Sequence, residues 1–366
     1  MPSSADTTIP ITLLTGFLGS GKTTLLNQLV RQPGMDRTLV VINEFGEIGL
    51  DHQLFSASRE TELVALDSGC LCCTVRGDLV RTLRDATWRF ARGGERFFDR
   101  LVIETTGLAD PAPILHTLMT DARIARAYRL DGVVTCVDAV HGHASLDAHD
   151  EAMKQAAMAD LLLLTKADLA DTATLAKLRA RLGALNHGAR QITVTHGHVD
   201  AGALTDLGID PQSAHGADIE RWLGSTPTVK TPQTGAATGL RLGAAVKTPA
   251  PTLAPTSVAN DPNRHDDRVR AHCFTFDTPI DADRLEVWLQ LMVSLMGERM
   301  LRIKGLIHIT GEARPAVIHG VQHIFHPMTW LDAWPDEDRR SRLVFITRDI
   351  PRESLAGILA ALDTTA

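Results

Sequence analysis

The sequence has few cysteines, no long apolar run and no excess of basic residues, and each absence excludes a class of protein. Five cysteines in 366 residues do not make the disulfide framework of a small secreted protein. No apolar stretch approaches the ~20 residues that span a bilayer. A net charge of -7 argues against a protein that coats nucleic acid or an anionic membrane. The N-terminal segment has neither a basic region nor an apolar core, so we expect no export signal and a cytoplasmic protein.

The composition is that of a folded chain, with 44% hydrophobic and 22% charged residues, and the length suits two domains of about 150 residues each. Residues 1–224 alternate short apolar runs with helical patterns, which predicts an α/β domain with a doubly wound, mostly parallel sheet. Residues 225–267 hold six of the 17 prolines without periodicity, which indicates a linker. Residues 268–366 predict a smaller α+β domain.

Apolar runs give the expected strands. In the first domain they are 11–14, 38–42, 63–66, 101–103, 133–137, 161–164 and 192–195. In the second domain we expect strands at 270–276, 301–309, 316–325 and 343–347, one helix capped by Asp281 and a last helix at 352–362.

The segment GFLGSGKT, residues 16–23, matches the phosphate-loop pattern G-x-x-x-x-G-K-[ST] between an apolar strand and a helix. Its glycines let backbone N–H groups converge on phosphates, and the helix N-terminus adds positive potential. Lys22 is predicted to reach the β- and γ-phosphates, and Thr23 to bind Mg²⁺. The residues predicted to bind the nucleotide here are Gly16, Gly19, Ser20, Gly21, Lys22, Thr23 and Thr24.

Two further segments fit a nucleotide hydrolase. The apolar run 101–104 ends in Glu104, which suits a Mg²⁺ role, and Gly107 follows where a backbone N–H meets the γ-phosphate. Residues 43–47 lie where a first switch segment belongs. No side chain is plainly a catalytic base, so we expect slow intrinsic hydrolysis that a partner or a homo-oligomer stimulates.

The run LLLLTKAD, residues 161–168, indicates guanine binding. The Asp168 carboxylate can accept both N–H donors on one edge of guanine and would be left unpaired against adenine. The Lys166 stem can cover the base. Thr165 stands where the usual motif has Asn, which weakens one base contact. We expect GTP and GDP as the nucleotides.

Three of the five cysteines, Cys70, Cys72 and Cys73, fall within four residues, between an expected strand and an expected helix. Thiolates grouped this closely in a loop suit Zn²⁺ or Cu(I), and three of them leave one tetrahedral position open, as a metal carrier needs. Core packing and redox chemistry are the alternatives. Cys136 and Cys273 are expected in the core.

The histidines offer weaker signals. His141 and His143 follow an expected strand and are possible auxiliary metal ligands, and the His196–His198 segment is expected near the base. His319 and His323 would lie about 13 Å apart on one strand, too far for a shared ion.

Six segments resemble, in this order, the CobW family of P-loop GTPases: GFLGSGKTTLLN, NEFGEIGLD, GCLCC, RLVIETTGLADPAP, DGVVTCVDAVH and LLTKADL. This family belongs with the hydrogenase and urease nickel GTPases, and residues 268–366 resemble its C-terminal domain. The resemblance implies GTP hydrolysis coupled to handling a metal for a client metalloprotein. That metal is usually Zn²⁺, in some members Co²⁺ or another ion such as Ni²⁺. It also implies that Cys70, Cys72 and Cys73 bind metal, with Glu44 as an extra ligand.

These observations predict a GTP-driven metallochaperone in which the nucleotide state moves the metal ligands. Two other classes remain open. One is a P-loop kinase or ATPase that acts on a small molecule and has structural cysteines. The other is a metal-responsive nucleotide switch that acts only by binding a client.

Overall fold

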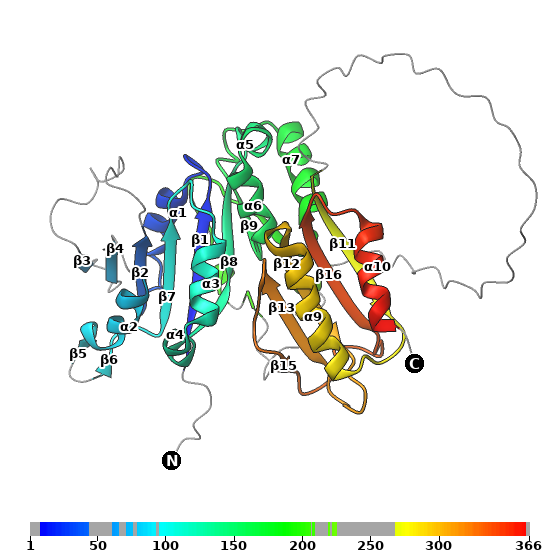
Figure 1. The fold of residues 1–366 in the computed structure, drawn as a ribbon. Coiled ribbons are helices and arrows are strands. Elements are labelled where there is room, and N and C mark those ends of the chain that lie inside the picture. The colour runs from blue at the N-terminus through cyan, green and yellow to red at the C-terminus, as the bar shows by residue number, and fades with distance from the viewer. Residues whose placement is uncertain are drawn as a thin grey trace, which may run out of the picture.

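The computed structural model describes residues 8–43, 61–65, 71–75, 79–92, 95–205, 207–208, 219, 222–224 and 268–363. These residues form two large sheets with their helices (Figure 1), and a short ribbon of β5 (Ala91–Arg92) and β6 (Glu95–Arg96). The predicted linker, 225–267, lies outside the described residues. None of the described helices is both long and apolar enough to cross a membrane.

The first sheet has eight strands in the described part of the chain. In chain order they are β1 (Ile9–Gly16), β2 (Thr38–Asn43), β3 (Thr61–Ala65), β4 (Leu71–Val75), β7 (Arg100–Thr105), β8 (Tyr128–Asp138), β9 (Leu161–Thr165) and β10 (Arg190–Thr193). The spatial order is β10-β9-β8-β1-β7-β2-β4-β3, and all neighbours are parallel except β3 and β4. The predicted doubly wound, mostly parallel sheet is confirmed. Because β7 and β8 flank β1 on opposite sides, the carboxyl ends of these strands form the crevice where such sheets bind ligands.

Helices cover both faces of this sheet, because successive strand residues point to opposite sides. Leu14 and Val40 pack on one face with α1 (Lys22–Leu29) and the 3₁₀ helix η2 (Ala201–Leu204). Leu13 packs in the core of the other face, with α2 (Leu79–Arg89), α3 (Ala112–Thr120), α4 (Ala122–Ala127), α5 (Gly142–Ala148), α6 (Asp150–Met158) and α7 (Thr172–Leu185).

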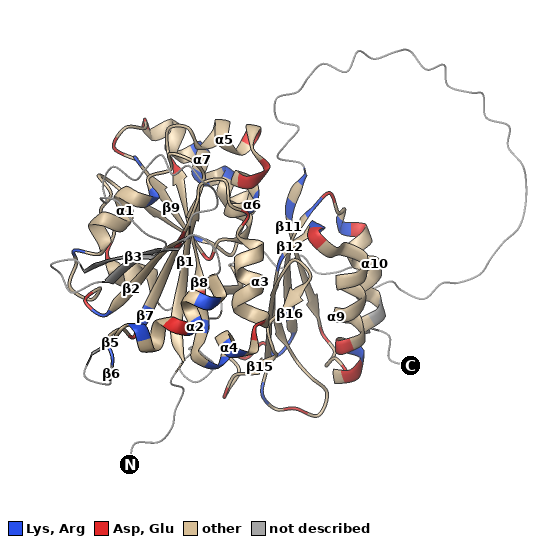
Figure 2. Ribbon diagram, turned by 60° about the vertical axis from the view of Figure 1, so that its left-hand side comes forward, with Lys and Arg blue, Asp and Glu red and all other residues tan. Residues whose placement is uncertain are grey.

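The second sheet is antiparallel, with the order β11-β16-β12-β13-β14, and β15 pairs with β13. Trp288 and Phe345 lie in the core that α9 and α10 cover, on the side away from the first domain (Figure 2). The Asp281 carboxylate accepts the Arg284 N–H and begins α9, as predicted. The elements are β11 (Val269–Phe276), α9 (Ala282–Met296), η3 (Gly297–Arg299), β12 (Met300–Ile307), β13 (Ala316–Val321), β14 (Ile324–Phe325), β15 (Thr329–Trp330), β16 (Ser341–Arg348) and α10 (Arg352–Asp363).

The single strand expected at 316–325 is instead a hairpin. β13 ends at Val321, and Gln322, with φ of 52°, turns the chain into β14. His319 and His323 therefore do not lie on one strand, and the 13 Å separation expected for them does not apply.

A buried cluster of charges joins the two sheets. Asp160, which precedes β9, lies 2.6 Å from Arg302 Nη2 and 2.8 Å from Lys304 Nζ, both on β12. Its second oxygen accepts the Val133 N–H. Burial opposes ionisation of Asp160, but the two cations lower its pKa to about 2. Burial lowers the pKa of Lys304 to about 8, although Asp160 acts in the opposite direction.

Candidate functional site

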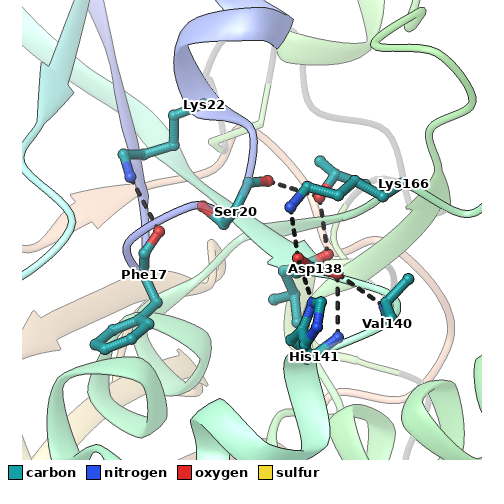
Figure 3. A network of polar contacts seen from close by, with 9 residues as sticks. Phe17, Ser20, Lys22, Asp138, Val140, His141 and Lys166 are labelled. Atoms are coloured by element: carbon teal, nitrogen blue, oxygen red, sulfur yellow. Dashed lines mark hydrogen bonds and ion pairs between the residues drawn. The ribbon is translucent and has the colours of Figure 1, made fainter. Parts of the chain in front are cut away.

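The phosphate loop connects β1 to α1. Gly16 must be glycine, because a Cβ there would lie 2.4 Å from the Cys136 carbonyl oxygen. Lys22 Nζ reaches back over the loop and donates to the Gly16 carbonyl at 2.7 Å and to the Phe17 carbonyl at 3.1 Å. Figure 3 shows the contact with Phe17. Gly21, with φ of 86°, begins α1 and directs the first N–H groups of the helix toward the loop. The loop therefore presents an ammonium group and backbone donors, the groups that bind phosphate.

Thr23 and Glu104 lie together at the edge of the sheet. The Thr23 hydroxyl, in the first turn of α1, donates to Glu104 Oε1 at 3.1 Å. Glu104 lies near the end of β7 and is only 4% exposed. A carboxylate and a hydroxyl, both hard oxygen donors, form a pair that fits Mg²⁺.

The loop after β7 lies directly on the phosphate loop. A Cβ on Gly107 would come within 2.7 Å of the Leu18 backbone, so only glycine fits this close approach. The side-chain amide of Gln155, on α6, donates to the Gly107 and Ala109 carbonyls at 3.1 and 3.0 Å. Sequence reasoning missed Gln155. Its helix also carries Glu151 and Lys154, so one more polar residue there was no signal.

Thr165, where the usual guanine motif has Asn, holds the phosphate loop in place. Its hydroxyl, at the end of β9, lies 2.6 Å from the Ser20 carbonyl and 3.2 Å from the Val137 carbonyl. A side chain that was expected only to weaken a base contact thus joins the loop of residues 165–168 (the predicted base loop) to β8 and the phosphate loop.

Lys166 is anchored by Asp138 at the end of β8, with Nζ 2.6 Å from Oδ2 (Figure 3). Asp138 also accepts the backbone N–H groups of Val140 and His141. Burial opposes its ionisation, but the hydrogen bonds from Lys166, His141 and Val140 outweigh it and lower the Asp138 pKa. The Lys166 stem therefore has a fixed course beside the phosphate loop.

Asp168 is oriented by the loop that follows β10. Its carboxylate accepts the His196 N–H at 3.1 Å and lies 3.2 Å from His196 Nδ1. The backbone hydrogen bond from His196 is the main cause that lowers the Asp168 pKa. The same loop packs on α1, because Gly197 lies against Thr24 and Gln28. Asp168 is thus an oriented carboxylate near the start of α1.

The cysteine motif was expected in a loop, but two of its residues, Cys72 and Cys73, lie within β4. They pair with Val40 and Val41 of β2, and β3 occupies the other edge of β4. A strand with partners on both sides satisfies its backbone groups better than a loop does. Glu44 and Cys70 lie outside the described residues, so the ligand set as a whole remains a prediction.

His141 and His143 lie far from the cysteine motif. They follow β8, four strands from β4 in the sheet, which is about 19 Å at the usual strand spacing. The His143 carbonyl accepts a hydrogen bond from Arg181 Nη1. Any metal ion held by the two histidines would therefore be separate from one held by the cysteines. The described residues contain no cluster of three or more His, Cys, Asp or Glu suited to a metal ion.

Cys136 differs from the clustered cysteines. It is 1% exposed in β8, and burial raises the pKa of its thiol to about 12. It therefore stays a neutral thiol, as the predicted core position requires.

The phosphate loop, the Thr23–Glu104 pair and the base loop, at the carboxyl edge of a parallel sheet, define a P-loop nucleotide-binding protein. Residues 10–193 match the model for the CobW/HypB/UreG nucleotide-binding domain. Residues 269–363 match the model for the cobalamin synthesis protein CobW C-terminal domain. The chain belongs to the CobW/HypB/UreG family, which confirms the predicted resemblance.

Several relatives are similar to this chain. The zinc chaperone YjiA of Escherichia coli is 33% identical over 354 residues, which cover 97% of this chain and 98% of that protein. The zinc-regulated GTPase metalloprotein activator 1 of Schizosaccharomyces pombe is 36% identical over 198 residues, 52% of this chain and 47% of that one. The crystal structure of the Zn(II)-bound YjiA GTPase from E. coli has a TM-score of 0.69 and 32% identity, with 98% of this chain and 99% of that chain covered.

Proposed function

We propose that this protein is a GTP-hydrolysing zinc metallochaperone that binds Zn²⁺ through its C-x-C-C motif and delivers it to a client metalloprotein. One observation carries the proposal. In a chain that is similar over nearly its whole length to a zinc chaperone, Lys22, Thr23 and Glu104 meet at the phosphate loop. The phosphate loop and the family support GTPase activity. The metal ligands and the delivery of Zn²⁺ to a client are what we propose beyond it.

In the proposed GTPase reaction, the side chains that bind the phosphates already lie at the phosphate loop before GTP arrives. When GTP binds, Lys22 exchanges the Gly16 and Phe17 carbonyls for the β- and γ-phosphates, and the Gly107 N–H faces the γ-phosphate. Thr23 and Glu104 would hold Mg²⁺, which would neutralise charge on the phosphates. No side chain in the described part of this site is plainly a catalytic base, so we expect the unassisted reaction to be slow.

Guanine selection rests on Asp168. His196 holds this carboxylate in one orientation, and its remaining acceptor capacity matches the two N–H donors of guanine. Lys166, anchored to Asp138, covers the base. Adenine has no N2 amine on this edge and its N1 is an acceptor, so the Asp168 carboxylate would be left unpaired against it.

In the metal part of the proposal, Cys70, Cys72 and Cys73 are the zinc ligands and Glu44 is an additional one. In sequence they lie between the phosphate loop and Glu104, so the nucleotide state can change their arrangement. The coupling is reciprocal: if GTP changes the affinity for Zn²⁺, then Zn²⁺ changes the affinity for GTP by the same factor. Co²⁺ and Ni²⁺ are the other ions that this proposal admits.

A zinc titration against a chromophoric chelator tests the metal part. It compares wild type with the triple variant C70S/C72S/C73S, each with GDP and with a non-hydrolysable GTP analogue. We expect tight zinc binding that depends on the nucleotide in wild type, and a loss of at least about 10²-fold in the variant, because serine is a poor zinc ligand.

The matched control for this titration is Cys273→Ser, which removes a thiol of the second sheet and should leave zinc affinity unchanged. Equal affinities for wild type and the triple variant would contradict the cysteine site. A zinc affinity indifferent to the nucleotide, with client binding that still depends on it, would favour the simple switch.

The nucleotide preference tests the role of Asp168. Asp168→Asn keeps the size of the side chain but replaces one acceptor oxygen by a donor, so the preference for GTP over ATP should fall by at least about 10²-fold. The measurement is kcat/KM for both nucleotides. Asp171→Asn is the control, because Asp171 only caps α7 three residues away. A wild-type preference for ATP would favour the kinase or ATPase class.

A further inference from the structure

Gln155 lies at the centre of contacts that join three segments. Its side chain is fully buried, and Nε2 donates to both Gly107 O and Ala109 O, one on each side of Leu108. Its own backbone carbonyl accepts the Thr135 hydroxyl of β8 at 2.8 Å. One residue of α6 therefore attaches the loop of residues 105–110, the Gly107 loop, to the central sheet.

The amide of Gln155 is anchored by its donors alone. Its Oε1 is buried and accepts no hydrogen bond from the residues that the structure describes. The side chain lines a cavity of about 190 Å³ between the phosphate loop, the end of β8 and helices α5 and α6. Among the described residues, the side chain thus forms hydrogen bonds only with the two loop carbonyls, whose position it fixes.

The adjacent residue makes a second, more exposed contact with the same loop. Lys154 Nζ lies 2.7 Å from Asp110 Oδ2, and both side chains are about a quarter exposed. Because partly exposed ion pairs are weakened by solvent, this contact holds the loop less firmly than the two buried hydrogen bonds do.

Both ends of α6 contact the C-terminal sheet. Asp150, its first residue, forms an ion pair with Arg348 of β16. The backbone carbonyl of Met158, its last residue, accepts a hydrogen bond from Arg302 Nη1 of β12 at 2.7 Å. Helix α6 therefore contacts the Gly107 loop through its middle and the second domain through both of its ends.

We propose that Gln155 is a positioning residue for GTP hydrolysis, which holds the loop of residues 105–110 so that the Gly107 N–H faces the γ-phosphate, and that α6 transmits the state of this loop to the C-terminal sheet. The proposal rests on the GTPase function given above. Glycine has wide conformational freedom, so the Gly107 peptide depends on an external contact to keep one orientation. The Gly107 loop lies against Leu18 of the phosphate loop. A triphosphate bound there would therefore change the hydrogen bonds that Gln155 donates to the Gly107 and Ala109 carbonyls.

The test uses Gln155→Met, which keeps the volume and removes both donors. GDP lacks the γ-phosphate, so its affinity should stay within twofold of wild type. The affinity for a non-hydrolysable GTP analogue and kcat for GTP should each fall about 10-fold, the loss expected for two neutral hydrogen bonds that matter only in the triphosphate state. Gln155→Glu, whose carboxylate repels the two carbonyls, is a second variant with the same expected result.

Transmission along α6 is tested by amide hydrogen exchange in residues 300–307, compared between the GDP and GTP-analogue states. Wild type should show a difference between the two states that Gln155→Met abolishes. The matched control is Gln191→Met, because the Gln191 amide also donates to a backbone carbonyl, that of Arg179, away from the phosphate loop. It should change neither measurement.

The outcomes separate this inference from the proposed function. A wild-type protein without GTPase activity overturns the proposed function. An active wild type with an unchanged ratio of GTP-analogue to GDP affinity in both Gln155 variants overturns the positioning role, because a merely structural residue would lower both affinities together. A changed ratio with an unchanged exchange difference overturns transmission through α6.

Discussion

Lys22→Ala is expected to lower kcat for GTP hydrolysis by about 10³-fold. Lys22 is the cation that the phosphate loop presents, and in the structure its ammonium group is held by the Gly16 and Phe17 carbonyls. Those carbonyl contacts keep the charge at the loop before the nucleotide arrives, so little reorganisation is needed to meet the charge that develops in the transition state. The measurement is phosphate release at saturating GTP.

The matched control is Lys177→Ala, which removes an exposed lysine from α7 and should leave kcat unchanged. The thermal midpoint of Lys22→Ala should stay close to that of wild type, because the hydrogen bonds from Lys22 to the Gly16 and Phe17 carbonyls lie within one loop. Retention of more than a tenth of the wild-type rate would mean that the phosphates bind elsewhere.

Asp160→Ala is expected to lower the free energy of unfolding by about 3–5 kcal/mol. The substitution leaves Arg302 and Lys304 buried at the domain interface without the carboxylate that pairs with both. Because the pKa of Asp160 is about 2 in the folded protein, below its ordinary value, its contribution is fully present above about pH 5. It is lost as the pH falls toward 2. Urea unfolding at pH 7 measures the effect.

Asp99→Ala provides the comparison, because Asp99 forms an ion pair with Arg37 at 2.7 Å but both side chains are more than half exposed. Removal of this pair should cost about 0–1 kcal/mol. If Asp160→Ala costs no more than Asp99→Ala, the buried charges do not hold the two domains together.

The features that the sequence predicted are those with local signals. The phosphate loop is a contiguous motif, and the parallel strands are short apolar runs between helical patterns, so both follow from neighbouring residues. The start of α9 at Asp281 is equally local. By contrast, β4 was missed because its two cysteines suggested metal ligands rather than strand residues, although they pair with β2 on one side and β3 on the other.

The missed contacts join residues that are distant in the chain. Thr165 contacts Ser20 across 145 positions, and Gln155 contacts Gly107 across 48. Neither pair has a motif, because the partner in each case is a backbone carbonyl, which every residue carries. Such contacts follow only from how the strands and helices pack. The hairpin after β13 was missed for a different reason: its turn uses Gln322 at positive φ, without the glycine or asparagine that usually indicates one.

The Thr165 hydroxyl affects how the base and the phosphates of one nucleotide combine their binding affinities. It joins the Ser20 and Val137 carbonyls, so the proposed base subsite at Lys166 and Asp168 and the phosphate loop keep one separation before any ligand arrives. A guanosine and a free triphosphate would each lose their own translational freedom on binding, whereas GTP loses it once. The fixed spacing makes GTP a bivalent ligand for this chain, in which each bound half raises the effective concentration of the other at its subsite.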